Sequence, residues 1–182
     1  MGMVDHVADT YTLLVVSIVL ACGYACQVSD SRTATSSDSA KAIVRRAVNE
    51  IWNRGNLAAV DELIAEDFID HAPFPGQLPG RDGFKQVLRT IRTAFPDATE
   101  TIEDLVAEGD RVVARVVIDG THKGPFMGVP PTGKRIHAGG MAILGVRGGK
   151  IVERWSYSDD ASVLVDLGAL KPVPNFRPQV LP

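Results

Sequence analysis

Cysteine is nearly absent from this sequence of 182 residues. The two cysteines, Cys22 and Cys26, both lie in an apolar segment near the start, and no thiol follows them. The rest of the chain therefore cannot contain a disulfide framework, a thiolate metal site or a cysteine nucleophile.

Histidine and the common catalytic motifs are scarce as well. The four histidines stand at positions 6, 71, 122 and 137, and no two of them have the spacing of metal ligands. The sequence contains no glycine-rich phosphate loop, no GxGxxG, no GxSxG and no HExxH. We therefore expect no metal site.

Neither sign of charge predominates in the sequence. The chain has 19 basic and 22 acidic residues, a net charge of −3, and both signs are interspersed. Without a basic block, nucleic acid is not expected as a partner. A hydrophobic fraction of 45% is enough to build one core, and the length predicts one domain with additional segments.

The additional segments are a leader, a linker and a tail. Residues 1–28 form an apolar leader, and residues 29–39 are polar, rich in serine and threonine, and typical of a disordered linker. The globular domain is expected at residues 40–168, followed by a proline-rich, irregular tail at residues 169–182.

The leader allows several interpretations. It fits a secretory signal peptide, a lipoprotein signal with Cys22 as the lipidated residue, or a retained membrane helix. Acidic residues precede the apolar run and basic residues follow it, which is the reverse of an ordinary signal. A retained helix would then leave the domain cytoplasmic, as would a translation start further along the chain. We expect export or membrane anchoring through this leader.

Helical periodicity dominates the first half of the domain. Apolar residues recur at helical spacing, and each run is bounded by a capping residue, a glycine or a proline. The predicted helices run from Ser39 to Gly55, from Leu57 to Ala65 after a cap at Asn56, and from Asp82 to Phe95.

The second half changes to the two-residue period of strands. Strands are predicted at residues 99–107, 111–121, 134–146 and 150–158, and a short helix ending at Gly168 follows them. Helices followed by a strand meander indicate an α+β fold. We expect a curved antiparallel sheet that wraps three helices into a cone, with a pocket at its open end.

Two clusters could carry chemistry. Asp70 and His71 form an adjacent acid–imidazole pair, suited to proton transfer or to organising the loop that follows. Arg154 could bind an anionic or carbonyl group, or form a salt bridge at the sheet edge. Strand alternation places Arg154 on one face with Ser156, opposite Ile151 and its neighbours Glu153 and Trp155. Side chains that fit a core or pocket wall are Trp52, Phe126 and Met127.

Three long segments carry a family resemblance. They read EIWNRGNLAAVDELIAEDFIDHAPFPGQLPGRDGFK, AFPDATETIEDLVAEGDRVVARVVIDGTHKGPFMGVPPTGKRI and GGKIVERW. In this order they resemble the SnoaL-like polyketide cyclase family, whose bacterial members are often called ester cyclases. The resemblance covers residues 41–168, and its most specific part is GTHKGPFMGVPPTGK. It implies a nuclear transport factor 2-like, cone-shaped α+β barrel, commonly a homodimer through the outer sheet face.

The resemblance also implies a chemistry. Characterised members close a ring of an aromatic polyketide ester by aldol condensation, without a metal or a cofactor, and use an aspartate on the last strand as acid/base. In this sequence that position holds Ser156, and the polar positions of the preceding strand hold Gly140 and Ala142. These residues and Arg154 are then expected to face the cavity. A serine cannot replace the aspartate as a base without an activating partner.

The sequence leaves two main functions open, and a dimerising scaffold is a third possibility. One is a cyclase-type enzyme for a small hydrophobic carbonyl or ester compound, with Asp70 or His71 as acid/base and Arg154 as the oxyanion clamp. The other is a non-catalytic module that binds a small hydrophobic molecule and is exported or tethered to a membrane.

Overall fold

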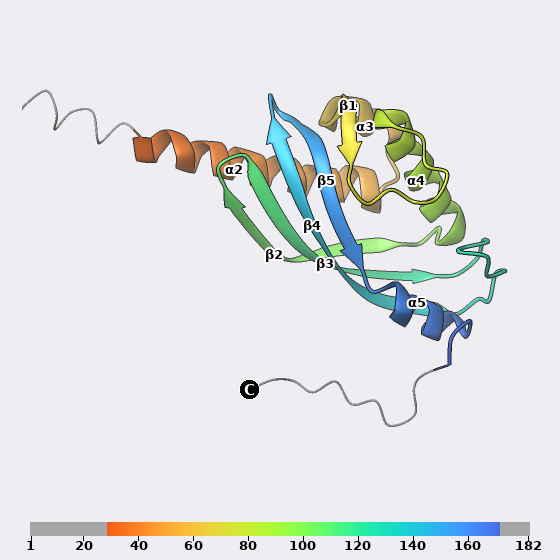
Figure 1. Cartoon of the computed structure of the whole chain (residues 1–182). Coiled ribbons are helices and arrows are strands. Elements are labelled where there is room, and N and C mark those ends of the chain that lie inside the picture. Colours follow the sequence, from red (N-terminus) through yellow and green to blue (C-terminus); the bar gives the residue numbers. More distant parts are fainter. Residues whose placement is uncertain (1–28, 172–182) are drawn as a thin grey trace, which may run out of the picture. The chain divides into compact units, whose positions relative to one another are not determined.

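The computed structural model describes the backbone of residues 29–171 and the side chains of residues 37–171 (Figure 1). The predicted leader and the predicted tail from residue 172 onward lie outside this range. None of the helices within residues 29–171 is long and apolar enough to cross a membrane.

The first helix is longer than expected. Helix α2 (Ser29–Ala47) continues as the π-helix η1 (Val48–Asn53) and stops before Gly55, which has a φ of +67°. The helix begins at Ser29 rather than near Ser39, so it includes the segment expected as a linker. That segment contains no glycine or proline to interrupt a helix.

The next two helices form close to their predicted positions, and the first of them has its predicted cap. Helix α3 (Leu57–Leu63) begins at Asn56, whose Oδ1 accepts hydrogen bonds from the N–H groups of Ala58 and Ala59 at 3.0 and 3.3 Å. Helix α4 (Gly80–Ala94) buries Phe84 and Leu88 on the face predicted to be apolar.

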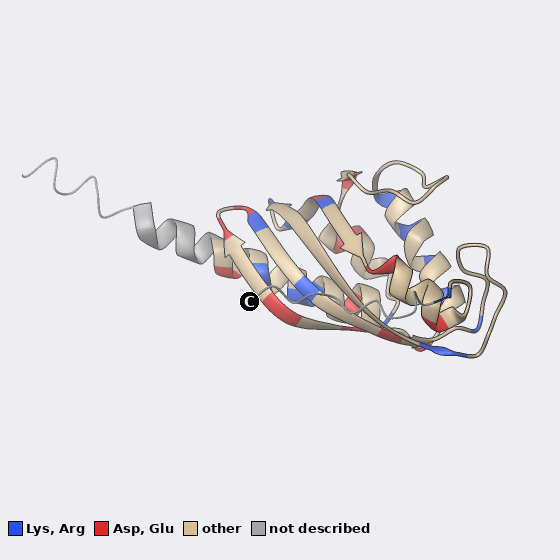
Figure 2. Cartoon of the chain, turned by 60° about the horizontal axis from the view of Figure 1, so that its bottom comes forward, with Lys and Arg blue, Asp and Glu red and all other residues tan. Residues whose placement is uncertain are grey.

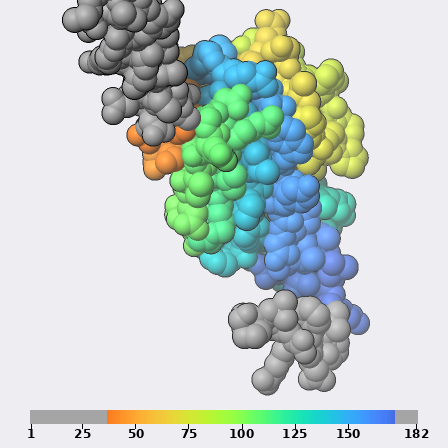
Figure 3. Space-filling view, turned by 60° about the vertical axis from the view of Figure 1, so that its left-hand side comes forward, coloured from red at the N-terminus to blue at the C-terminus, as the bar shows by residue number. Residues whose placement is uncertain are grey.

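The strand meander forms as predicted. Its strands are β2 (Thr99–Glu108), β3 (Arg111–Thr121), β4 (Arg135–Arg147) and β5 (Lys150–Ser158). Helix α5 (Asp160–Leu167) follows, with Asp159 as its N-cap and Gly168 left-handed at its end. Figure 3 shows β2 to β5 side by side on one face of the molecule.

The sheet has one strand more than the meander. Strand β1 (Ile64–Asp70) adds to the edge of β5 and gives the order β1-β5-β4-β3-β2. Because β1 runs parallel to β5, the sheet is mixed, which corrects the expectation of a purely antiparallel one. Pairing with β5 satisfies the backbone groups along an edge that would otherwise stay open.

The curved sheet wraps around the helices and closes two hydrophobic clusters (Figure 1). The larger cluster joins α2, η1, α3 and α4 to the sheet. Its most buried side chains include Val44, Ile51, Val60, Leu88 and Val112. The smaller one includes Phe95, Phe126, Ile136 and Val163. Figure 2 shows that acidic and basic residues are both spread over the sheet and the helices.

A bulge in β5 changes which side chains share a face. Gly145 pairs with Glu153 and Val146 pairs with Ile151, so Val152 is an extra residue in the strand. Ile151 is therefore turned to the inner face with Arg154, where it is 2% exposed. The expectation that Ile151 shares a face with Glu153 is wrong, because simple alternation does not allow for a bulge.

The loop between β3 and β4 is locked onto the end of α4. The N–H groups of Lys123 and Gly124 both donate to the carbonyl of Ala94, at 2.8 and 3.1 Å. His122 is fully buried, and its Nδ1 accepts a hydrogen bond from the N–H of Thr132 at 3.3 Å. The segment GTHKGPFMGVPPTGK thus fixes the rim of the sheet to a helix.

Gly124 is expected to be essential for this contact. A Cβ atom at position 124 would lie 2.3 Å from the carbonyl oxygen of Thr93, whereas one at Gly139 would meet nothing within 4 Å. Gly124→Ala should therefore lower the free energy of unfolding by about 2 kcal/mol or more, measured by chemical denaturation. Gly139→Ala is the matched control and should be neutral or slightly stabilising. Equal effects of the two substitutions would contradict this interpretation.

Candidate functional site

A cavity of about 510 Å³ lies between the inner face of the sheet and the helices. This volume is within the range of small-molecule sites, and the wall is mainly apolar. The structure places on this wall Arg154 and all the residues expected to shape a pocket: Trp52, Phe126, Met127, Gly140, Ala142 and Ser156. The face on which Arg154, Ser156, Gly140 and Ala142 were expected is thus the inner one.

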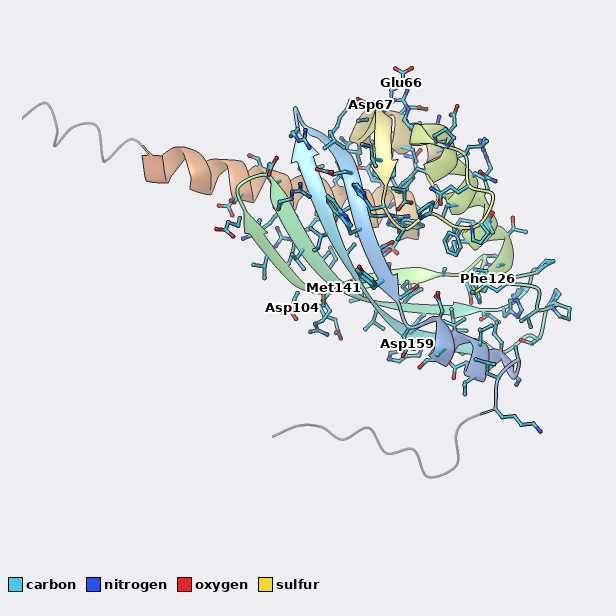
Figure 4. The ribbon with its side chains drawn as sticks, viewed as in Figure 1. Glu66, Asp67, Asp104, Phe126, Met141 and Asp159 are labelled. Atoms are coloured by element: carbon cyan, nitrogen blue, oxygen red, sulfur yellow. The ribbon has the colours of Figure 1, made fainter. Side chains whose placement is uncertain are left out.

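Most acidic side chains of the domain point away from the cavity. Glu66 and Asp67 of β1 point away from the sheet, and Asp104 lies on its outer side (Figure 4). The acidic residues on the cavity wall are Glu100 of β2 and Asp160 of α5.

Arg154 carries a positive charge into the apolar interior. The residue is 9% exposed, and its Cζ lies 5.4 Å from the ring centre of Phe84 and 6.0 Å from that of Trp52. Its Nη2 donates to Oδ2 of Asp70 at 2.5 Å. Its Nε is buried and has no hydrogen-bond partner among the described residues. An unpartnered buried donor is costly, and a ligand acceptor could satisfy it.

Asp70 holds Arg154 in place and does not line the cavity. Its carboxylate is 4% exposed and also accepts hydrogen bonds from the Ala72 N–H at 3.2 Å and the Gln77 side chain at 3.0 Å. Burial by itself would raise the pKa of Asp70, but the charge of Arg154 and these hydrogen bonds outweigh it and lower that pKa. Asp70 is therefore ionised at neutral pH.

His71 lies apart from both the cavity and Asp70. Its ring stacks on Trp155, with centroids 4.0 Å apart and planes 3° apart, and its Nε2 is 3.3 Å from Oε2 of Glu153. Adjacent residues at the end of a strand point to opposite faces, so the structure does not bring Asp70 and His71 together as a pair. Arg111 also contacts Trp155, with its Cζ 4.6 Å from the ring centre.

Glu100 is the polar residue that the sequence interpretation missed. It faces the cavity from β2, where it pairs with Ile118 of β3. Burial raises the pKa of Glu100 to about 7, and the charge of Arg154 opposes this rise. The sequence did contain a signal for this position. Glu100 lies two residues before Ile102, so alternation along the strand puts both on the same face.

No activating partner of Ser156 is found in the part of the chain that the structure describes. It lies on the cavity wall opposite Ala142, and within residues 37–171 its hydroxyl makes no hydrogen bond to an imidazole or a carboxylate. The same part of the chain contains no cluster of histidine, cysteine and acidic side chains that could hold a metal. Proton transfer in this cavity would have to involve another group.

The ion pair of Asp70 and Arg154 predicts a pH-dependent loss of stability. Asp70→Asn leaves a buried guanidinium unpaired and should cost about 3 kcal/mol of unfolding free energy at pH 7. A lowered pKa means that the carboxylate stabilises the fold above its ordinary pKa of 3.8, and that this stabilisation is lost as the pH falls further. The difference between wild type and variant should therefore shrink below about pH 4.

Urea denaturation at several pH values would measure this difference. Asp61→Asn is the matched control, because Asp61 forms its ion pairs with Lys85 and Arg81 at an exposed site and should matter much less. An Asp70→Asn effect as small as that of the control would contradict the role of the buried pair.

Comparison with known proteins agrees with this architecture. The sequence profile of the SnoaL-like polyketide cyclase family matches residues 42–167. The nogalonic acid methyl ester cyclase of Streptomyces nogalater is 29% identical over 119 residues, which cover 64% of this chain and 89% of that relative. The aklanonic acid methyl ester cyclase DauD of Streptomyces sp. (strain C5) is 28% identical over 144 residues, or 75% of this chain and 86% of the relative.

Solved structures show the same fold. TsrD from Streptomyces laurentii superimposes with a TM-score of 0.68 at 27% identity, over 73% of this chain and 97% of that one. The crystal structure of IdmH from Streptomyces antibioticus gives a TM-score of 0.64 at 36% identity, over 71% of this chain and 98% of that one. With its family profile matched over most of the described domain, the chain belongs to the SnoaL-like polyketide cyclase family.

Proposed function

We propose that this protein is a cofactor-independent, ester cyclase-type enzyme that acts on a small hydrophobic carbonyl or ester compound in the cavity. The observation that carries the proposal is the buried guanidinium of Arg154, which reaches an apolar cavity with its Nε unpartnered. An apolar wall with few polar groups selects a mainly apolar ligand and orients it through those groups.

Arg154 would stabilise the negative charge that develops on a carbonyl oxygen when the neighbouring carbon loses a proton. Its guanidinium is oriented in advance by Asp70 and by contacts with Trp52 and Phe84, so little reorganisation is needed during the reaction. The apolar surroundings exclude water, which strengthens the attraction between the guanidinium and the oxyanion.

The substrate class follows from the relatives. The enzymes of Streptomyces nogalater and strain C5 are named for the methyl esters of nogalonic and aklanonic acid. We propose a polyketide-like ester of this kind for the present protein as well, because a cavity of about 510 Å³ with an apolar wall suits a compact, apolar ring system.

A non-catalytic binding module is the second candidate. Ser156, without an activating partner, stands where the family resemblance implies an aspartate, and this observation favours binding without turnover. Such a module could be exported or tethered through the leader, which remains a prediction because residues 1–28 are outside the described range.

We also propose that the protein is a homodimer through the outer face of the sheet. Ile143 is 38% exposed and alternates along β4 with the cavity residue Ala142, so it gives the outer face of the sheet an apolar side chain. Ile143→Glu should therefore produce monomers in analytical ultracentrifugation, whereas the wild type sediments as a dimer. A wild type that is monomeric at micromolar concentration would contradict this proposal.

The enzymatic proposal predicts turnover that depends on Arg154. The methyl esters of nogalonic and aklanonic acid would be incubated separately with the protein, and ring closure would be followed by chromatography, because the product of an aldol closure is an isomer. Arg154→Gln should lower kcat by about 100-fold or more, as expected for the loss of an oxyanion donor.

A double variant separates chemistry from folding. Arg154→Gln alone leaves Asp70 buried without its cation, whereas Arg154→Gln with Asp70→Asn removes both charges and should fold better than either single variant. Both variants should show this loss of kcat if Arg154 acts on the substrate. Wild-type turnover in a folded double variant would refute this role, and binding of the esters without turnover would favour the binding module.

A further inference from the structure

The side chain of Glu100 faces the cavity, and none of the described residues pairs with its carboxylate. Within residues 37–171 it accepts no hydrogen bond and forms no ion pair, although other acids of the domain have partners of this kind. Arg154, which contributes an electrostatic attraction to Glu100, is paired with Asp70 instead. Among the described residues, the cavity therefore has an acid without a partner and a guanidinium that is paired with a different carboxylate.

The fold holds Glu100 in this position firmly. The side chain of Asn53 in η1 binds its backbone twice: Oδ1 accepts the Glu100 N–H at 2.6 Å, and Nδ2 donates to the Glu100 carbonyl at 3.0 Å. Residue Trp52, next to Asn53, has its ring 6.0 Å from Cζ of Arg154. The end of η1 thus places Glu100 and Arg154 at the same part of the cavity wall.

We propose that Glu100 is the acid/base group of this cavity, which removes a proton from the carbon beside the ligand's carbonyl and later returns it. This inference rests on the proposed function, because it names the group that moves the proton while Arg154 stabilises the oxyanion. It places proton transfer on β2, whereas the family resemblance implies a residue at the position of Ser156 on β5.

The step balances without a co-reactant. The Glu100 carboxylate takes the proton, and the electron pair of the broken C–H bond becomes the enolate. The enolate carbon then forms a C–C bond to a second carbonyl carbon, whose oxygen becomes an alkoxide. Protonated Glu100 gives its proton to this alkoxide, so the product is an isomer of the substrate and the carboxylate is restored.

The protonation of Glu100 suits this role. Burial among apolar side chains raises its pKa to about 7, so both forms are populated near neutral pH. Efficient proton transfer needs a group whose pKa lies close to the working pH, able to accept and to donate within one cycle. Asp70, with its lowered pKa, could not donate a proton under these conditions.

The test uses a probe that does not depend on the natural substrate. The compound 5-nitrobenzisoxazole is a compact aromatic carbon acid. A carboxylate that removes its C–H proton drives the electron pair into a nitrile, breaks the N–O bond and releases a coloured phenolate. The full-length protein should accelerate this reaction, with a rate that rises with pH and levels off above about 7. Glu100→Gln should lower the rate by about 100-fold or more.

Two further variants make the test specific. Glu108→Gln removes an exposed carboxylate at the end of the same strand and should leave the rate unchanged. Glu100→Asp keeps a carboxylate but withdraws it by one methylene group, and should retain part of the rate. A folded Glu100→Gln variant with the wild-type rate, or a wild type that does not accelerate the probe reaction, would overturn the inference.

Stability gives a readout that is independent of activity. Because the pKa of Glu100 is raised above its ordinary value of 4.5, ionisation destabilises the fold as the pH rises from about 4.5 through about 7. Glu100→Gln removes this ionisation. Its melting temperature relative to wild type should therefore increase between pH 5 and pH 8. A constant difference over this range would contradict the desolvated, unpaired state of this half-buried carboxylate.

The outcomes also separate this inference from the proposed function. If neither methyl ester is converted but the probe reaction depends on Glu100, the proposed substrate class is wrong and Glu100 keeps its role. If the esters are converted by wild type and by Glu100→Gln at the same rate, the enzyme assignment stands and the inference about Glu100 is wrong.

Discussion

Arg154 carries a charge into an apolar interior, and the fold has to neutralise that charge where it lies. It does so with Asp70, at the end of the edge strand β1, which pairs with Arg154 in parallel register. The same contact joins β1 to β5, and the His71 N–H extends it with a bond to the Arg154 carbonyl at 2.8 Å. A buried pair of this kind is a weak source of net stability. Its more specific effect is to fix one guanidinium against the cavity wall.

The two carboxylates near this guanidinium are treated in opposite ways. Asp70 is paired with Arg154 and accepts two further hydrogen bonds, and these contacts lower its pKa in spite of burial. Glu100 is desolvated and has no such partner among the described residues, so its pKa is raised. Environments that drive two acids apart in this manner assign them different roles. Asp70 positions Arg154, and Glu100 retains a proton that can move near neutral pH. The family resemblance implies an aspartate where this chain has Ser156, and in Glu100 the cavity still has an acid on its wall.

The shape of the cavity depends on backbone features that bring distant segments into contact. The bulge at Val152 turns Ile151 and Arg154 to the same inner face, and the close approach of Gly124 to Thr93 fixes the rim loop to α4. Both decide how the curved sheet meets the helices, and so determine which side chains can reach a bound molecule.

Local sequence patterns determined much of this protein. The cap at Asn56, the meander of strands and the family motif that ends at Lys134 were all readable from residues close together in the chain. Contacts between distant residues were decided by tertiary structure alone. Asp70 and Arg154 are 84 positions apart, and no local periodicity indicates that they pair or that β1 lies parallel to β5. The raised pKa of Glu100 likewise arises from residues packed around it by the fold, because desolvation is a property of three-dimensional surroundings.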